Sequence, residues 1–95
     1  MPTLIGTYQT PNAAKYLQQL CKHFAHKIDA THDETTGFAP FIFGPAKFAA
    51  DAQTLSVTFD LNNCTDIPSA KHVIDAHLER FAHREDFKTM QWSET

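Results

Sequence analysis

The stretch that most constrains the fold is residues 55–61, LSVTFDL, where apolar and polar side chains alternate. Leu55, Val57, Phe59 and Leu61 fall on one side of a strand, and the residues between them are polar. Successive side chains of a strand point to opposite faces, so this strand has one buried face and one wetted face. The pattern therefore predicts a sheet that is covered on one face.

Two helical stretches can supply that cover. Residues 12–27 carry an apolar stripe at helical spacing, and Thr10-Pro11 before them is typical of a helix start with Thr10 as the N-cap. A second helix is expected to be capped by Asp66 or Thr65, with Pro68 near its first turn. The expected inner faces consist of Ala13, Leu17, Leu20, Cys21, Phe24 and Ile28 in the first helix, and Ala70, Ile74, His77, Leu78 and Phe81 in the second.

The remaining β-branched and aromatic stretches predict strands, with a break at Gly44-Pro45. We interpret the order as β-α-β-β-β-α-β, two β-α-β halves around a central hairpin arm. The expected fold class is α+β, with two helices packed on one face of a mostly antiparallel five-stranded sheet, ferredoxin-like with an added strand. Residues 1–95 are expected to form a single domain. The predicted strand stretches besides 55–61 are 3–10, 28–33, 38–43, 46–51 and 86–92.

Composition limits the classes of function. The chain has 95 residues, 42% of them hydrophobic, which suits one two-layer core. A net charge of −3 argues against a general nucleic-acid binder, which needs a basic face. The sequence shows neither a leader nor an apolar run long enough to span a membrane, and its two cysteines are far apart. We therefore expect a cytoplasmic protein that binds neither nucleic acid nor membrane.

One short pattern occurs twice, as CKHFAHK at residues 21–27 and as ERFAHRE at residues 79–85, each time where a helix should end. An ancient duplication and a coincidence both account for it. In either case the Phe would anchor the last helical turn. The His and the basic residue would suit the negative end of the helix dipole.

The two helical blocks carry a family resemblance. PNAAKYLQQLCKHFAHK near the start and AHLERFAHRE before the last strand resemble the bacterial domain-of-unknown-function family 2218, over nearly the whole chain. The resemblance implies a small bacterial protein without an established activity, and a link of some members to iron or siderophore handling. His83 stands where the family pattern leads us to expect an aromatic residue, so no family-wide role is given to His83. No catalytic residue is carried over.

His77 and Cys21 are the candidate metal ligands among the six histidines and two cysteines. His77 falls within the apolar stripe of the second helix and Cys21 on that of the first, so side-by-side helices would bring them near each other. A Cys/His pair can bind a soft metal or form an activated thiolate. The competing interpretation is a core His bonded to a backbone carbonyl, beside an inert buried Cys. His23 and His26 are assigned to the solvated face of the first helix.

A basic rim is expected at the C-terminal ends of both helices. Arg80 and Arg84 are four residues apart, and Lys22 and Lys27 end the first helix. Such a rim could hold a carboxylate or a phosphate. The competing interpretation is that each cation neutralises a neighbouring acidic residue.

The chain also holds more phenylalanine than one small core needs. The surplus is expected to cover the second face of the sheet or to form a homodimer contact. The residues concerned are Phe38, Phe41, Phe43 and Phe48, with Met90 and Trp92 near the terminus.

Two functional hypotheses follow. The first is a non-enzymatic accessory domain, without a required cofactor, that binds a small molecule or a protein partner. Its ligand-binding residues would be His77, Cys21, Arg80, Arg84 and Lys27. The alternative is a metal- or haem-dependent activity centred on His77.

Overall fold

The computed structural model describes residues 2–85, 87 and 89–94. Six strands and two α-helices lie in this part of the chain, together with two short 3-10 turns. The elements are β1 (Thr3–Gln9), α1 (Ala13–Phe24), β2 (Thr31–His32), β3 (Thr36–Phe41), β4 (Gly44–Ala50), β5 (Thr54–Asp60), η1 (Cys64–Asp66), α2 (Ile67–Phe81), η2 (His83–Glu85) and β6 (Gln91–Glu94).

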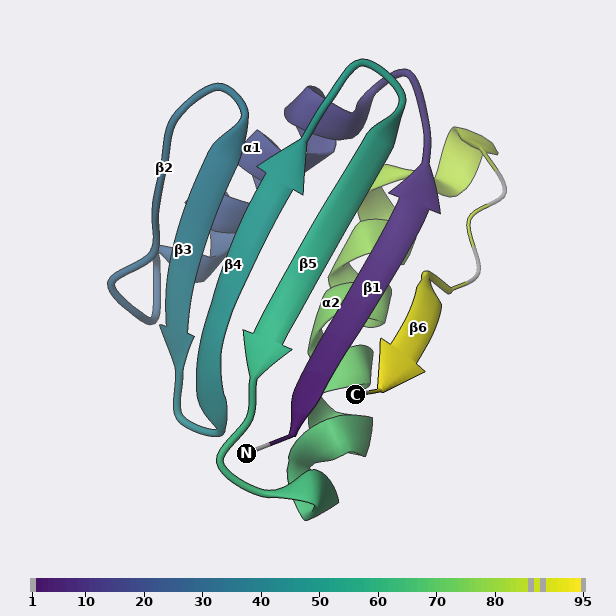
Figure 1. Ribbon diagram of the computed structural model, residues 1–95. Coiled ribbons are helices and arrows are strands. Elements are labelled where there is room, and N and C mark those ends of the chain that lie inside the picture. The colour runs from purple at the N-terminus through teal and green to yellow at the C-terminus, as the bar shows by residue number, and fades with distance from the viewer. Residues whose placement is uncertain (1, 86, 88, 95) are drawn as a thin grey trace.

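The strands form one sheet in the order β2-β3-β4-β5-β1-β6, and the neighbouring strands pair antiparallel. Both helices lie behind this sheet, α1 behind β3 and β4 and α2 behind β5 and β1 (Figure 1). The predicted α+β class, with two helices on one face of an antiparallel sheet, is confirmed. Among the described residues the sheet has six strands and not five. The order β-α-β-β-β-α-β counted three strands between the helices, although four stretches there were predicted as strands, and all four join the sheet.

The core lies between the sheet and the helices, as the alternation in residues 55–61 predicts. Leu55, Val57 and Phe59 are fully buried on the helix side, while the residues between them are half-buried. The inner faces of the helices also follow the predicted stripes. The buried helix residues are Ala13, Tyr16, Leu17, Leu20, Cys21, Phe24, Ala70, Ile74 and Leu78.

Several predicted boundaries shift for local reasons. Gly44 does not break the sheet: it begins β4 at a φ of 139°, a left-handed conformation that glycine adopts easily, directly after the two-residue turn Ile42–Phe43. The stretch 28–33 contributes only Thr31–His32 as strand. β6 begins at Gln91 rather than at residue 86. Asp86 and Lys88, at the start of the predicted last strand, lie outside the described residues.

The expected cap of the first helix is also wrong. Asn12 and not Thr10 stands at the N-cap, and its side chain makes no capping hydrogen bond. The Thr10 hydroxyl instead accepts a bond from the backbone N–H of Asn12, 3.1 Å away. The helix therefore begins two residues later than the Thr-Pro signal indicates. The second helix does begin after Asp66, as predicted.

The two repeated stretches fall at helix ends, as expected: Phe24 is the last residue of α1 and Phe81 the last of α2. The residue after the Phe differs in burial between the two stretches. Ala82 is fully buried, whereas Ala25 is exposed. The residue after the Phe is therefore packed into the core in the second stretch alone.

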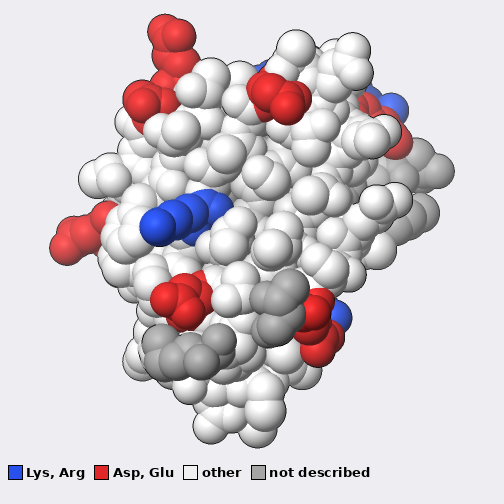
Figure 2. Space-filling view, in the orientation of Figure 1, with Lys and Arg blue, Asp and Glu red and all other residues white. Residues whose placement is uncertain are grey.

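The surplus phenylalanines pack on the helix side of the sheet. Phe41 stacks on Phe43 with ring centres 5.2 Å apart, and both rings contact Phe59. Of the phenylalanines expected on the second face, Phe38 alone is classed as exposed, at 39%. Figure 2 shows that the open face is mostly uncharged, with acidic side chains around its margin. The expectation of a phenylalanine-covered second face is therefore wrong except at Phe38.

Candidate functional site

The candidate functional site is a groove between the two helices and β3. We call it the interhelix groove. It encloses about 240 Å³, and its lining combines apolar and basic side chains from three elements. The residues that line it are His23, Phe24, Lys27, Ile28, Phe41, Val73 and His77.

The floor of the interhelix groove is aromatic and aliphatic. The rings of Phe24 and Phe41 meet edge to face with centres 5.0 Å apart, and Ile28 and Val73 complete the apolar surface. Phe24 also stacks on Phe48 in the core, at 6.3 Å. Since the core fixes the rings beneath it, the floor is largely preformed.

Two histidines from different helices face each other at the mouth of this groove. The ring centres of His23 on α1 and His77 on α2 are 4.4 Å apart, and the His77 ring also meets that of Phe24 at 5.1 Å. The pKa of His23 lies below its ordinary value, first because of desolvation and then because of the positive charge of its neighbours. Those neighbours are His77, His26, Lys27 and Arg80.

The backbone of α2 fixes the His77 ring. Its Nδ1 lies 2.6 Å from the carbonyl oxygen of Val73, one helical turn earlier. Because a carbonyl can only accept, Nδ1 carries the hydrogen and donates it. Nε2 is then the nitrogen of His77 that remains available to a ligand or a proton.

Cys21 belongs to a different environment. Its Sγ faces β3, 2.6 Å from the position that a Cβ on Gly37 would occupy. Burial raises the pKa of this thiol to about 11, so it is not an activated thiolate. Cys21 thus faces the sheet, whereas His77 faces His23. Among the described residues, no group of three or more His, Cys, Asp or Glu side chains is placed to hold a metal ion.

The basic residues named from the sequence separate in space. Lys27 lines the interhelix groove, and Arg80 is close enough to His23 to influence it. Arg84 is exposed in η2, beyond the end of α2, and does not line this groove. His23, assigned from the sequence to the solvated face, is the histidine that meets His77.

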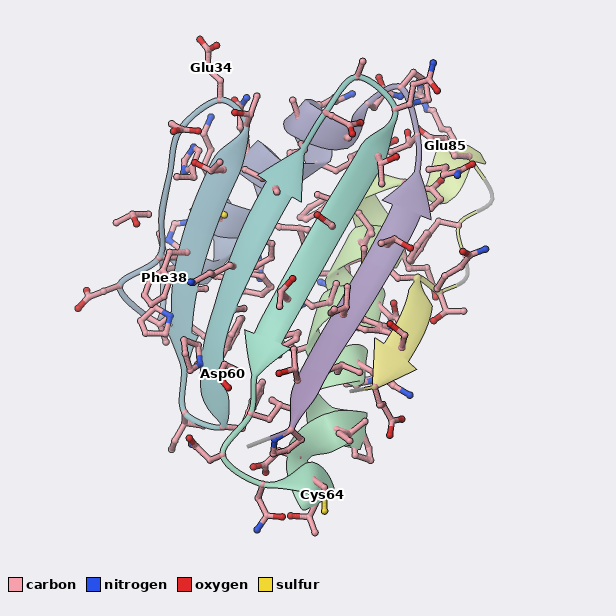
Figure 3. The ribbon with its side chains drawn as sticks, viewed as in Figure 1. Glu34, Phe38, Asp60, Cys64 and Glu85 are labelled. Atoms are coloured by element: carbon pink, nitrogen blue, oxygen red, sulfur yellow. The ribbon has the colours of Figure 1, made fainter. Side chains whose placement is uncertain are left out.

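A second polar cluster surrounds Glu85, which no sequence pattern indicated. Figure 3 places Glu85 beside the end of β1. Its Oε1 accepts hydrogen bonds from the hydroxyls of Tyr8 at 2.7 Å and Thr10 at 2.8 Å. Its Oε2 accepts from Asn12 Nδ2 at 2.8 Å and from the Tyr16 hydroxyl. We call these residues the Glu85 cluster.

The Glu85 cluster joins η2 to β1 and α1, and its bonds keep the carboxylate charged. Desolvation would raise the pKa of Glu85, but bonds from Tyr16, Asn12, Tyr8 and Thr10 together lower it to about 2. Both oxygens already accept two bonds each, which fills the ordinary capacity of a carboxylate. The cluster therefore suits a structural role better than a binding role.

A third hydrogen-bonded group holds the approach to β6. Asp75 on α2 accepts bonds from Thr89 Oγ1, from the backbone N–H of Met90 and from Trp92 Nε1, at 2.7, 3.0 and 3.0 Å. The Trp92 ring occupies the space that a side chain at Gly6 would fill, since a Cβ there would lie 2.6 Å from the ring. The short edge strand is thereby fixed to both α2 and β1.

Fold and site together define the class of protein: a small α+β domain with two helices on one face of an antiparallel sheet and a groove between those helices. The chain belongs to a family of uncharacterized proteins conserved in bacteria (DUF2218), whose pattern matches residues 6–93.

A comparison with solved structures finds a protein with a similar fold. The chain is similar to the NMR structure of PA4090 from Pseudomonas aeruginosa, with a TM-score of 0.79 and 24% sequence identity, over 98% of this chain and 96% of that chain. At this identity the likeness concerns the fold. No curated protein matches the sequence. Within the described residues, neither helix is long and apolar enough to cross a membrane.

Proposed function

We propose that this protein is a non-enzymatic binding domain that accepts a small amphipathic anion in the interhelix groove. One observation carries the proposal: an apolar floor of Phe24 and Phe41 lies directly below a mouth that carries His23, His77 and Lys27. A ligand with an apolar body and an anionic head matches both parts.

The basic side chains around the interhelix groove support an anionic ligand. The basic side chains of Lys27 and Arg80 both act on His23. The positive potential at the mouth opposes a further positive charge there and favours a negative one. An apolar body on the floor would add affinity in proportion to the area it removes from water.

Titration of the isotope-labelled protein with octanoate, followed by backbone and side-chain NMR shifts, tests the proposal. Saturable shifts should concentrate at His23, Phe24 and Val73. Octanol, which has the same chain without the charge, should bind at least fivefold more weakly. Absence of saturable shifts at these residues with octanoate and with octyl sulfate would refute the proposed function.

Two matched variants test whether the charge of Lys27 contributes to octanoate binding. Lys27→Gln should weaken octanoate binding about three- to fivefold, because it removes one cation from the mouth. Lys15→Gln changes the same charge on the exposed first turn of α1 and should leave the affinity unchanged. Equal effects of the two variants would mean that net charge, rather than the groove, governs binding.

The alternative function is a metal- or haem-dependent activity centred on His77. It is supported by the facing ring of His23, 4.4 Å away, which provides a second imidazole. Lys27 and Arg80 oppose a bound cation at the same place. Elemental analysis and absorbance of untagged protein decide between the two functions. The alternative is favoured if the protein contains stoichiometric metal or haem and if His77→Gln removes it while the fold is retained. A link to iron or siderophore physiology rests on the family resemblance and stays a prediction.

A further inference from the structure

The helices cover one surface of the sheet, and we call the other surface the open face (Figure 1). The strand register arranges the side chains of the open face in three rows that cross the sheet. The first row comprises Thr36, Ala49, Ser56, Thr7 and Gln91, the second Phe38, Lys47, Thr58, Ile5 and Ser93, and the third Pro40, Pro45, Asp60 and Thr3. Lys47 and Asp60 are the charged members of these rows, and the other members are uncharged.

The composition of the open face suits contact with another protein surface. Charged residues make up 20% of the chain, but on this face acidic side chains gather at the margin and leave a broad uncharged middle (Figure 2). Depletion of charge at the centre of a patch is typical of protein interfaces. Phe38, which is 39% exposed, adds an aromatic ring beside Lys47. Most other members are Thr, Ser, Ala or Pro, whose short side chains allow a second sheet to stack at ~10 Å.

The two charged residues indicate what covers this face. Lys47 on β4 lies opposite Thr58, and Asp60 lies two residues further along β5 on the same face. Within the part of the chain that the structure describes, Lys71 and Glu94 form an ion pair, and neither Lys47 nor Asp60 takes part in one. A cation and a carboxylate, both without an ion-pair partner, make this surface complementary to itself. A twofold axis in the plane of the face, midway between these two residues, places each against its counterpart in a second copy.

The area of the open face is enough for a weak dimer. Neighbouring strands are ~4.8 Å apart and a seven-residue strand is ~24 Å long, so the six-stranded face covers on the order of 500 Å². Two copies would together bury about 1,000 Å², which is the lower limit for a specific interface. We therefore expect a dissociation constant on the order of 100 µM.

We propose that two copies of this chain associate through their open faces, with Lys47 of each copy paired to Asp60 of the other. The interhelix groove lies on the opposite side of the sheet, where the helices are, so it stays accessible in this dimer (Figure 1). The dimer is therefore independent of the proposed function, and either proposal can fail without the other.

Sedimentation equilibrium between 10 µM and 1 mM tests the association. The average mass should rise from that of one chain toward that of two. Amide NMR shifts over the same range locate the contact: the shifts of Phe38, Thr58 and Ile5 should change together, while those of α1 and α2 stay constant. Shifts that concentrate on the helices would overturn the proposal. Protein that stays monomeric at 1 mM would also overturn it and would leave the open face to a different partner.

Reversed charges test the pairing itself. Lys47→Glu places two carboxylates at each contact and Asp60→Lys places two ammonium groups there, so each variant alone should associate at least tenfold more weakly. An equimolar mixture of the two should form heterodimers with about the wild-type affinity, because every contact between unlike chains then joins opposite charges. Circular dichroism and the Tm of each variant show that the fold is retained.

Lys15→Glu and Glu79→Lys are the matched controls, because they make the same changes of charge at exposed positions of α1 and α2. Alone or mixed, these controls should leave the dissociation constant unchanged. Equal weakening by the controls would mean that net charge governs association and would overturn the proposal. A mixture of Lys47→Glu and Asp60→Lys that associates as weakly as either variant alone would overturn the pairing of these two residues.

Discussion

Glu85 gives the sharpest prediction about stability. Four neutral donors, on Tyr8, Thr10, Asn12 and Tyr16, hold its carboxylate and connect η2 to the start of the chain. The cluster also raises the pKa of Tyr16 to about 12, because burial and the neighbouring carboxylate both disfavour the phenolate. Glu85→Gln keeps the size of the side chain and removes its charge.

The expected magnitude follows from the pKa of Glu85, which falls from 4.5 to about 2. Each unit corresponds to ~1.4 kcal/mol, so a fully sheltered carboxylate would contribute about 3 kcal/mol. Solvent screens this half-buried group, and we therefore expect Glu85→Gln to lower the free energy of unfolding by about 1 to 2 kcal/mol at pH 7. For a domain of this size that is a decrease of about 5 to 10 °C in Tm.

The pH dependence gives a second, independent signature. A carboxylate whose pKa is lowered by folding stabilises the protein above its unfolded pKa, and that stabilisation is lost as the pH falls toward the folded value. The wild-type protein should thus lose it between about pH 5 and pH 2, whereas Glu85→Gln lacks it at every pH. The two unfolding free energies should converge near pH 2.

Urea unfolding followed by the fluorescence of Trp92 measures both effects. Glu34→Gln is the matched control, since Glu34 is exposed in the loop between β2 and β3 (Figure 3). That variant should stay within about 0.5 kcal/mol of the wild type. The reasoning is refuted if Glu85→Gln is as stable as Glu34→Gln at pH 7, or if its stability still falls like that of the wild type between pH 5 and pH 2.

Three further predictions concern the core and its edges. Gly37→Ala should lower the unfolding free energy by about 1 to 3 kcal/mol, since its Cβ would meet Cys21 Sγ at 2.6 Å. Adding Cys21→Ala to this variant should restore part of the loss. If urea unfolding shows that the effects of the two substitutions simply add, the contact is contradicted. A thiol reagent should modify exposed Cys64 at once and buried Cys21 only after denaturant is added; equal rates would contradict the burial. Asp75→Ala should cost about 1 to 3 kcal/mol and increase the hydrogen exchange of the Trp92 indole, which would otherwise stay protected.

The sequence predicted the layers of the fold because periodicity reports which side of an element is buried. The alternation in LSVTFDL and the helical stripe through Leu17 and Leu20 both describe buried faces that the structure contains. The number of strands and their first and last residues were harder to predict from the sequence. Residues 28–33 lose all but two residues to loop, and Gly44 starts a strand through a backbone angle that no pattern of side chains records.

The candidate site was predictable only in part. The position of His77 in an apolar stripe pointed to a half-buried histidine, and the stripe is real. Its partner could not be inferred, because whether His23 or Cys21 meets His77 depends on how far α1 is rotated and shifted against α2. Periodicity fixes the buried side of each helix but not that offset. The Glu85 cluster depends on contacts between residues 69 to 77 positions apart, which leave no local signal.

The sequence alone thus determined the class of the fold, the buried faces of the two helices and of β5, and the family of the protein. These follow from local patterns, in which each residue acts with neighbours a few positions away. The tertiary structure alone decided which polar groups meet. The His23–His77 pair, the separation of Cys21 from that pair and the four donors around Glu85 arise from packing between elements, and that packing is set by the shape of the whole core.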